Sequence, residues 1–254
     1  MYIFKGTCID GILFKNITEV LYNFFKTLYM NIDDKGIHSR VMTNDGMILF
    51  DIVMPADRFE DWESAHPLLF GINLMNFYNL ISSVKKKDSI EFSIEEARPR
   101  ELCFTIHPKE YKYVERNKFT IQDVQIVEIS LPTGYDAEGI EVPYQRFHKM
   151  CKELNKITRE LKIYGNRHFI TFAGETAGIY GKEIPFPEPP TPEQLRVPLA
   201  LDGTFDMEQF IKLSKIVSFG KPVKFFIKED LPLLIQTDIG SLGTVSIFIK
   251  KRDE

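Results

Sequence analysis

Apolar residues recur at helical spacing in two stretches of the chain, and each stretch runs directly into alternating apolar and polar residues. Residues 73–96 read NLMNFYNLISSVKKKDSIEFSIEE, and residues 206–229 read DMEQFIKLSKIVSFGKPVKFFIKE. Helical spacing followed by period-two alternation predicts a helix that leads into a strand. Because the stretches align without a gap at an offset of 133 residues, the helix–strand unit is predicted to occur twice.

A second pair of predicted helices aligns at the same offset. Four apolar residues of 10–26 fall on four apolar residues of 143–159. In order, Phe14, Ile17, Leu21 and Phe24 meet Phe147, Met150, Leu154 and Ile157. Chance alignment of amphipathic helices is the alternative, but two helix–strand pairs in one register favour an internal duplication. The four predicted helices are 10–26, 73–87, 143–159 and 206–221.

Alternating runs are frequent elsewhere and predict strands. They are MILFDIVM, SIEFSIEE, ELCFTIHP, KFFIKE, LPLLIQTDI and TVSIFIKK. Few helices and many strands predict an α+β fold with antiparallel sheets, in two similar domains with two helices each. The predicted domains are 1–121 and 137–254. The connecting segment is 122–136, which begins extended and breaks at Pro132 and Gly134. The stretch 184–198 contains six prolines and is predicted to be a surface loop.

Composition limits the function classes. The formal net charge is −4 and 44% of the residues are hydrophobic, so the whole chain does not have the charge of a general nucleic-acid binder. Three scattered cysteines favour a reducing compartment over a disulfide framework. No apolar run of about 18 residues or apolar N-terminal segment is present, so neither a membrane span nor a secretion signal is expected.

Positive charge gathers on the predicted helices. These four segments carry +8, and the rest of the chain carries −12. On 143–159 the basic residues fall on one side and the apolar residues on the other. A solvated helix face is the alternative explanation. Lysines on a rigid face suit phosphates and do not read bases, so the pattern predicts sequence-independent contact with duplex backbone.

Motifs for catalysis and for cofactor binding are absent from the sequence. There is no GxxxxGK[ST], GxGxxG, HExxH, GxSxG or CxxC, and the five histidines do not pair at metal-ligand spacing. Acidic pairs that include Asp33 and Glu229 are more typical of solvated turns than of metal sites. We therefore expect no catalytic residue, metal or cofactor, and a nuclease using these carboxylates is the least favoured alternative.

Four ordered stretches resemble a known family over nearly the full chain. They are NIDDKGIHSRVMTNDGMILFDIVM, FGINLMNFYNLISSVKKKDSIEFSIEE, FHKMCKELNKI and DLPLLIQTDIGSLGTVSIFIKK. In order, spacing and duplicated layout the chain resembles the sliding clamps of the proliferating cell nuclear antigen type. The resemblance implies a non-enzymatic DNA polymerase processivity factor. It implies a homotrimeric ring that encircles double-stranded DNA, with helices lining the hole and strands forming an outer sheet.

The resemblance also implies two sets of site residues. The candidate DNA-facing residues are Lys15, Lys85, Lys86, Lys87, Arg146, Lys149, Lys152, Lys156, Lys212, Lys215 and Lys221. A partner groove beneath the connecting segment would take short hydrophobic peptides of replication and repair proteins, such as a flap nuclease or a ligase. Its walls would be Met42, Met47, Leu49, Ile129, Leu131, Pro232 and Phe248. The other implied partners are a DNA polymerase and a clamp loader.

Subunit contacts in the family pair edge strands, which correspond here to 112–121 and 176–184. The alternatives are a subunit of a heterotrimeric clamp, replicative or of the checkpoint type, and a clamp-fold scaffold that does not encircle DNA. Three departures indicate a divergent member, either viral or from a distant lineage, and do not decide between these sources. Arg167 replaces a modifiable lysine, prolines replace an acidic loop, and the sequence ends IFIKKRDE without the usual Ala-Pro. Localisation would be the nucleus for a cellular eukaryotic clamp, and otherwise the cytoplasm or a viral replication site.

Overall fold

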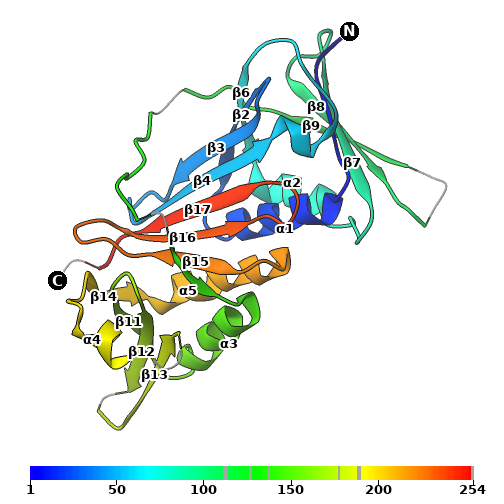
Figure 1. The fold of residues 1–254 in the computed structure, drawn as a ribbon. Helices are drawn as coiled ribbons and strands as arrows, with labels where there is room; N and C mark the ends of the chain where they lie inside the picture. The colour runs from blue at the N-terminus through cyan, green and yellow to red at the C-terminus, as the bar shows by residue number, and fades with distance from the viewer. Residues whose placement is uncertain (111–113, 126–127, 137, 177, 188–189, 253–254) are drawn as a thin grey trace. The chain divides into compact units, whose positions relative to one another are not determined.

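The chain folds into two compact units (Figure 1). The computed structural model describes residues 1–110, 114–125, 128–136, 138–176, 178–187 and 190–252. Unit 1 comprises Met1–Val41, Phe50–Ile129 and Asp238–Val245, and unit 2 comprises Met42–Leu49, Ser130–Thr237 and Ser246–Glu254. Each unit thus takes one short segment from the part of the chain that mainly builds the other.

Unit 1 holds the N-terminal elements, which are antiparallel strands and two α-helices. In chain order they are β1 (Tyr2–Cys8), α1 (Gly11–Tyr22), β2 (Thr27–Asp33), β3 (Gly36–Met42), β4 (Ile48–Pro55), the 3-10 helix η1 (Ala56–Arg58), β5 (Glu60–Ser64), β6 (Leu68–Asn73), α2 (Leu74–Ile81), β7 (Ser89–Glu95), β8 (Glu101–His107) and β9 (Glu115–Thr120). One sheet has the strand order β5-β1-β7-β8-β9, and β6, β2, β3 and β4 also follow one another. Helices α1 and α2 lie side by side (Figure 1), and α1 also packs against β7.

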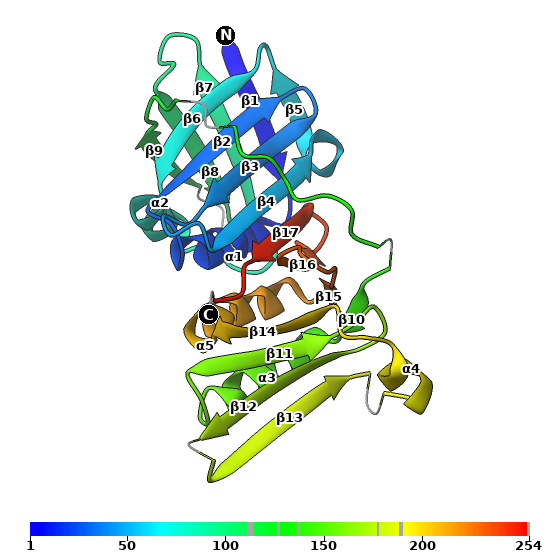
Figure 2. The same cartoon turned by 90° about the vertical axis from the view of Figure 1, so that its left-hand side faces the viewer.

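Unit 2 holds the remaining elements (Figure 2). They are β10 (Ile140–Val142), α3 (Tyr144–Leu154), β11 (Glu160–Gly165), β12 (Ile170–Thr176), β13 (Tyr180–Phe186), α4 (Pro192–Arg196), β14 (Leu201–Asp206), α5 (Met207–Leu213), the 3-10 helix η2 (Ser214–Phe219), β15 (Val223–Phe226), β16 (Leu233–Asp238) and β17 (Thr244–Ile249). One sheet has the order β13-β12-β11-β14, and β10, β15, β16 and β17 also follow one another. Helix α3 packs against α5 and η2.

The internal duplication predicted from the sequence is present in the structure. Four elements of unit 1 begin 133 residues before their counterparts in unit 2, namely α1 before α3, β2 before β11, β6 before β14 and α2 before α5. The strand orders also correspond, because β6-β2-β3-β4 matches β14-β11-β12-β13. The predicted α+β class with antiparallel sheets is confirmed.

Phenylalanines at matched positions build both cores. In unit 1, the Phe14 ring lies 4.7 Å from Phe92 and 6.2 Å from Phe77, centroid to centroid. Their counterparts at the 133-residue offset are Phe147, Phe225 and Phe210. The Phe147 and Phe225 rings lie 5.7 Å apart, and Phe172 lies 5.3 Å from Phe225 and 6.4 Å from Phe210. Such tilted and edge-to-face pairs add roughly 0.5–1.5 kcal/mol each beyond area burial.

The helices are shorter than the sequence predicted, so their predicted ends were wrong. The clearest case is α2, which ends at Ile81, whereas a helix to residue 87 was expected. Lys87 adopts a left-handed backbone with φ of +78°. The buried Asp88 carboxylate accepts hydrogen bonds from the backbone amides of Lys85 (2.8 Å) and Lys109 (3.2 Å). This network stabilises a turn in place of another helical turn.

All six predicted alternating runs form strands, but the proline-rich stretch 184–198 was only partly predicted. Its first residues complete β13, and Pro192–Arg196 form the five-residue helix α4. The Thr191 hydroxyl accepts from the Gln194 amide (3.3 Å), and the Gln194 side chain accepts from the Thr191 amide (2.7 Å). This capping box starts a helix at a proline whose missing N–H would have no helical partner. Within the described residues, no helix has the length and apolar character needed to cross a bilayer.

Candidate nucleic-acid interface and partner groove

Lys15 on α1 is committed to a structural contact. Its ammonium donates to the backbone carbonyls of Ser82 (2.6 Å) and Val84 (3.1 Å), which follow α2. Carbonyls at a helix C-terminus lack helical hydrogen-bond donors and carry partial negative charge. A lysine ammonium there donates the missing hydrogen bonds and offsets the charge. Lys15 therefore joins α1 to the end of α2, a role that the sequence did not predict.

The other candidate lysines of unit 1 lie in the turn after α2. Lys85, Lys86 and Lys87 are all exposed. Helix α2 itself has no charged residue and exposes the amide side chains of Asn76 and Asn79. Positive charge in this unit therefore comes from a turn, and not from a helix face as predicted.

Helix α3 has the predicted separation of faces. Arg146, Lys149 and Lys152 are exposed, while Phe147 and Leu154 are buried, and Met150 and Cys151 are buried with them. Lys156 is exposed in the turn that follows. Glu153 lies 3.7 Å from Lys149 and 2.7 Å from Lys182, and its hydrogen bond with Lys182 lowers the pKa of the Glu153 carboxyl. The helix thus presents a row of cations with one carboxylate at its edge.

The remaining candidates of unit 2 are spread over α5, η2 and the turn after them. Lys212 pairs with Glu208 at 2.7 Å, and this hydrogen bond lowers the pKa of Glu208. Lys215 and Lys221 are exposed. Counted on the observed helices, the net charge is +3, because seven basic residues of the predicted segments (Lys26, Lys85–Lys87, Lys156, Arg159 and Lys221) and two acidic ones (Asp10 and Asp206) lie outside them. The predicted +8 on the helices was therefore an overestimate.

His148 holds α3 to η2. Its Nδ1 lies 3.3 Å from the Ser214 carbonyl oxygen, and the side chain is half-buried. His148 is therefore part of the packing that fixes the basic face of α3.

Six of the seven candidate groove residues belong to unit 2. Three of them, Met42, Met47 and Leu49, lie on or beside the turn between β3 and β4, which is held by hydrogen bonds. The Thr43 hydroxyl donates to the Asp45 carboxylate (2.5 Å), which also accepts from the Met47 amide (3.0 Å). The hydrogen bond from Thr43 lowers the pKa of Asp45, and Gly46 takes a φ of +71°. On this turn Met42 is 45% exposed, while Leu49 is only 7% exposed.

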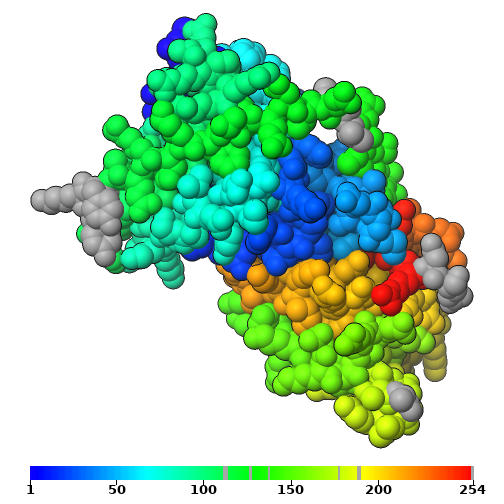
Figure 3. All heavy atoms as spheres, turned by 180° about the vertical axis from the view of Figure 1, so that it is seen from behind, coloured from blue at the N-terminus to red at the C-terminus, as the bar shows by residue number. Residues whose placement is uncertain are grey.

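Tyr135 completes this set and was missed by the sequence analysis. Its hydroxyl donates to the Pro232 carbonyl (2.7 Å), and its ring lies 6.1 Å from that of Phe248. Burial raises the pKa of Tyr135 to about 12. The residue therefore holds the end of the connecting segment against Pro232 and β17. Red atoms of the C-terminal segment are visible at the molecular surface (Figure 3), and Lys250, Lys251 and Arg252, which follow β17, are exposed.

Ile129 is the seventh candidate and ends a segment of unit 1. The Arg40 Nη1 donates to the Ile129 carbonyl (2.9 Å), and the Arg40 Nε donates to Asp51 (2.9 Å). Arg40 was also missed by the sequence analysis. It fixes the middle of the connecting segment, at Ile129, to β3 and β4 of this unit.

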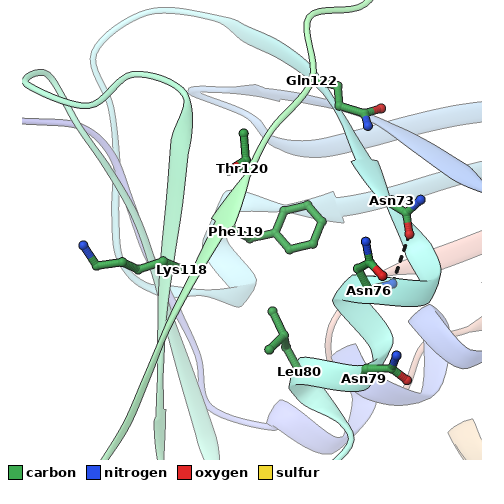
Figure 4. Close-up of a pocket in the computed structure, with 8 residues that line it drawn as sticks. All are labelled: Asn73, Asn76, Asn79, Leu80, Lys118, Phe119, Thr120 and Gln122. Carbon is green, nitrogen blue, oxygen red and sulfur yellow. Dashed lines mark hydrogen bonds between the residues drawn. The ribbon is translucent and has the colours of Figure 1, made fainter.

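A cavity of about 460 Å³ lies between α2 and β9 in unit 1 (Figure 4). Amide side chains dominate its lining, and the Phe119 ring points from β9 toward α2 while Lys118 points away. The lining residues are Asn73, Asn76, Asn79, Leu80, Lys118, Phe119, Thr120 and Gln122. Asn73 also caps α2 by accepting from the Asn76 amide at 3.0 Å. The cavity opens beside the segment 112–121 predicted to contact another subunit.

Both segments predicted to form subunit contacts lie at sheet edges within the described residues. Strand β9 ends the five-stranded sheet, and β13 ends the four-stranded sheet. Exposed apolar side chains mark these edges. Val114 precedes β9, and Ile179 (78% exposed) and Tyr180 (55% exposed) stand at the start of β13. Residues 112, 113 and 177 of the two segments lie outside the described residues. The part of the chain that the structure describes holds no group of three His, Cys, Asp or Glu placed to bind a metal ion.

Comparison with known proteins identifies the family. A family model described as "Proliferating cell nuclear antigen, N-terminal domain" matches residues 3–129. The chain belongs to the proliferating cell nuclear antigen family. The family resemblance seen in the sequence is therefore confirmed.

Two relatives of this member of the proliferating cell nuclear antigen family are viral. The chain is 21% identical to a "Probable DNA polymerase sliding clamp 1" of Paramecium bursaria Chlorella virus 1, with 97% of this chain and 96% of that protein covered. It is 20% identical to a "Probable DNA polymerase sliding clamp" of Acanthamoeba polyphaga mimivirus, over 86% of this chain and 47% of that protein. The chain thus spans about half the length of the mimivirus relative. Identities this low mark a divergent family member.

Proposed function

We propose that this protein is a DNA sliding clamp, a processivity factor that encircles duplex DNA and tethers a DNA polymerase. The observation that carries the proposal is the family match over residues 3–129 together with a second copy of the same layout at an offset of 133 residues. In this proposal the two domains are 1–121 and 137–254, joined by 122–136. The names of the two viral relatives support this assignment.

The ring is proposed to be a homotrimer closed through the edges β9 and β13. An exposed sheet edge offers unpaired N–H and C=O groups, and ring closure removes both edges at once. The exposed Val114, Ile179 and Tyr180 support this choice of edges. The amide-lined cavity beside β9 adds concave surface that a neighbouring copy could cover.

Basic side chains are proposed to guide the enclosed duplex without fixing it. The strongest candidates are Lys149, Lys152 and Lys156 on and after α3, because they are exposed on one side of the helix. Arg146, Lys212, Lys215, Lys221 and Lys85–Lys87 add weaker, sequence-independent contacts. Lys15 contributes mainly to the packing of α1 on α2, given its two carbonyl partners.

The groove residues of unit 2 are proposed to bind short hydrophobic peptides. Met42, Met47, Leu131 and Pro232 supply adaptable apolar surface, with the buried Leu49 and Phe248 beneath them and Tyr135 beside them. The partners in this proposal are a DNA polymerase, a clamp loader, and repair proteins such as a flap nuclease and a ligase. The protein acts without catalysis of its own, at a viral replication site or in the nucleus.

Topological retention tests the proposal without the native polymerase or loader. A linear duplex is biotinylated at both ends, incubated with labelled protein, and then blocked with streptavidin. A clamp that threads from free ends is retained on the blocked duplex at high salt and released when one end is cut by a restriction enzyme. Release at the same rate from blocked and cut duplex would contradict encirclement. A mass of three times 29.5 kDa for the purified chain supports the homotrimer, and a monomer that trimerises only with other chains supports a heterotrimer.

A further inference from the structure

The segment Lys250–Arg252, here called the basic tail, begins beside the groove. It follows β17 directly, and Phe248 lies near the end of that strand. The backbone amide of Lys250 donates to the carbonyl of Met47 at 2.9 Å. The first residue of the basic tail is therefore hydrogen-bonded to the candidate groove residue Met47 and follows the candidate groove residue Phe248 by two positions.

The basic tail is held in place at its other end. The amide of Arg252 donates to the Thr204 carbonyl of β14 at 2.8 Å. The Arg252 guanidinium lies 3.3 Å from a Glu160 oxygen and 3.3 Å from an Asp206 oxygen, and these two acids face each other across β11 and β14. Two backbone hydrogen bonds and two ion pairs thus fix the segment on unit 2.

The three positive charges of the basic tail are used differently. The Arg252 charge is shared with Glu160 and Asp206. The stem of Lys251 lies over Gly203, where an added Cβ would come within 3.0 Å of the Lys251 Cβ. Both Lys250 and Lys251 are exposed. The tail therefore places the exposed Lys250 beside Met47, with a second exposed lysine next to it on a segment that is already ordered.

We infer that the basic tail makes the groove select peptides that carry acidic side chains beside their hydrophobic plug. The inference rests on the proposed function, because it names the charge of the peptide that the proposed groove takes. Charge complementarity around an apolar contact sets partner choice, since a basic flank would meet Lys250 and Lys251 with like charge. Since the tail is fixed by Arg252, a peptide gains these contacts without ordering the tail first.

The expected size of the effect follows from exposed ion pairs. Such pairs change an equilibrium constant by about 1.4- to 5-fold each. Two lysines should therefore raise the affinity for a peptide with an acidic flank by roughly 2- to 25-fold over a peptide with a neutral flank. The Debye length is about 8 Å at 0.15 M salt. The preference should therefore shrink as salt rises, while apolar binding of the plug persists.

The test is fluorescence anisotropy with three labelled synthetic peptides on the intact protein. All three carry the same hydrophobic plug and aromatic residues, and their flanks are acidic, neutral or basic. The expected order of affinity is acidic, then neutral, then basic. Because salt screens the charges, the differences in affinity among the three peptides should become smaller between 50 and 300 mM salt. Equal affinities for all three flanks overturn the inference and leave the proposed groove standing. No binding of any peptide overturns the groove and the inference together.

Two variants and one control assign the effect to the basic tail. Lys250→Glu with Lys251→Glu is expected to reverse the order of the acidic and basic peptides while the neutral peptide binds as before. Arg252→Gln, which removes both ion pairs, is expected to narrow the preference by loosening the segment. Lys162→Glu is the matched control, because Lys162 is an exposed lysine of β11 paired with Asp202 (3.5 Å) and takes no part in the groove. A reversal in the control, or an unchanged order in the double tail variant, contradicts the assignment. Asp253 and Glu254 are kept in every variant.

Discussion

Neutralising two lysines at the end of α3 should weaken the salt-sensitive hold on DNA without affecting the fold. The change is Lys152→Gln with Lys156→Gln. Both side chains are exposed, one in the last turn of α3 and the other in the turn that follows. Exposed substitutions of this kind usually change the free energy of unfolding by less than about 0.5 kcal/mol, so ring formation and thermal stability should match the unmodified protein.

The magnitude follows from counterion release. Each phosphate neutralised by a lysine contributes about 0.9 to the slope of log affinity against log salt concentration. In the proposed trimer the substitutions remove two lysines from each of three copies, so the slope should fall by up to about 5 if all contact phosphates at once. A sliding ring makes only part of these contacts at any moment, which makes this value an upper bound.

The assay is the lifetime of labelled clamp on linear duplex with one open end, measured between 50 and 200 mM salt. The matched control is Lys162→Gln with Lys224→Gln, two exposed lysines on strands β11 and β15. The reasoning is refuted if the α3 variant keeps the original salt slope while remaining trimeric. It is equally refuted if the control loses as much slope as the α3 variant.

Three further predictions concern packing and pH. Lys15→Met removes the two hydrogen bonds to the Ser82 and Val84 carbonyls and should lower the free energy of unfolding by about 1.5–3 kcal/mol in urea titrations; reduced DNA retention at unchanged stability would contradict the structural role. Tyr135 has its pKa raised from 10.0 to about 12, so folding favours the neutral phenol; its contribution to stability is complete below about pH 10 and is lost as pH rises through 12. Tyr135→Phe should remove this loss of stability at alkaline pH, measured as the melting temperature against pH. The same alkaline fall in melting temperature in the variant would contradict this role of Tyr135. Asn166→Ala removes buried hydrogen bonds to the carbonyls around α4 and should make the segment after β13 more sensitive to limited proteolysis, whereas equal cleavage rates would count against this anchoring.

The repeat and both cores could be predicted from the sequence because apolar periodicity reports them directly. Phe14 and Phe147 occupy the same place on matched helices, and each packs on a phenylalanine of the strand 78 residues further on, Phe92 and Phe225. Most side chains buried in a core are apolar, and they recur with the period of their element. The pattern therefore carries enough information to place them.

Helix ends could not be predicted because they depend on single polar contacts. Periodicity continues through Val84, which is buried like the helix residues before it. The chain nevertheless turns after Ile81, where Asp88 binds the amides of Lys85 and Lys109. An aspartate that follows three lysines has no distinctive pattern, so the predicted helix was too long and carried too much charge.

Contacts between distant residues account for the rest of what the sequence missed. Tyr135 and Pro232 lie 97 residues apart, and Lys15 and Ser82 lie 67 apart. Neither pair belongs to a motif with fixed spacing. Family resemblance placed Pro232 in the groove, but only the folded arrangement gives Tyr135 its partner and gives Lys15 a structural role.

The proposed ring contains six domains of similar fold, but their helices carry different charges. Its charge distribution therefore repeats three times around the ring, whereas its fold repeats approximately six times. Helices α1 and α2 carry one lysine and one glutamate between them, whereas α3, α5 and η2 carry a net +3. Six similar domains would then place their cations alternately on a helix face, in unit 2, and in the turn that holds Lys85–Lys87, in unit 1. A threaded duplex would meet these two kinds of cationic surface in turn as it rotates through the ring, with three equivalent positions in each revolution.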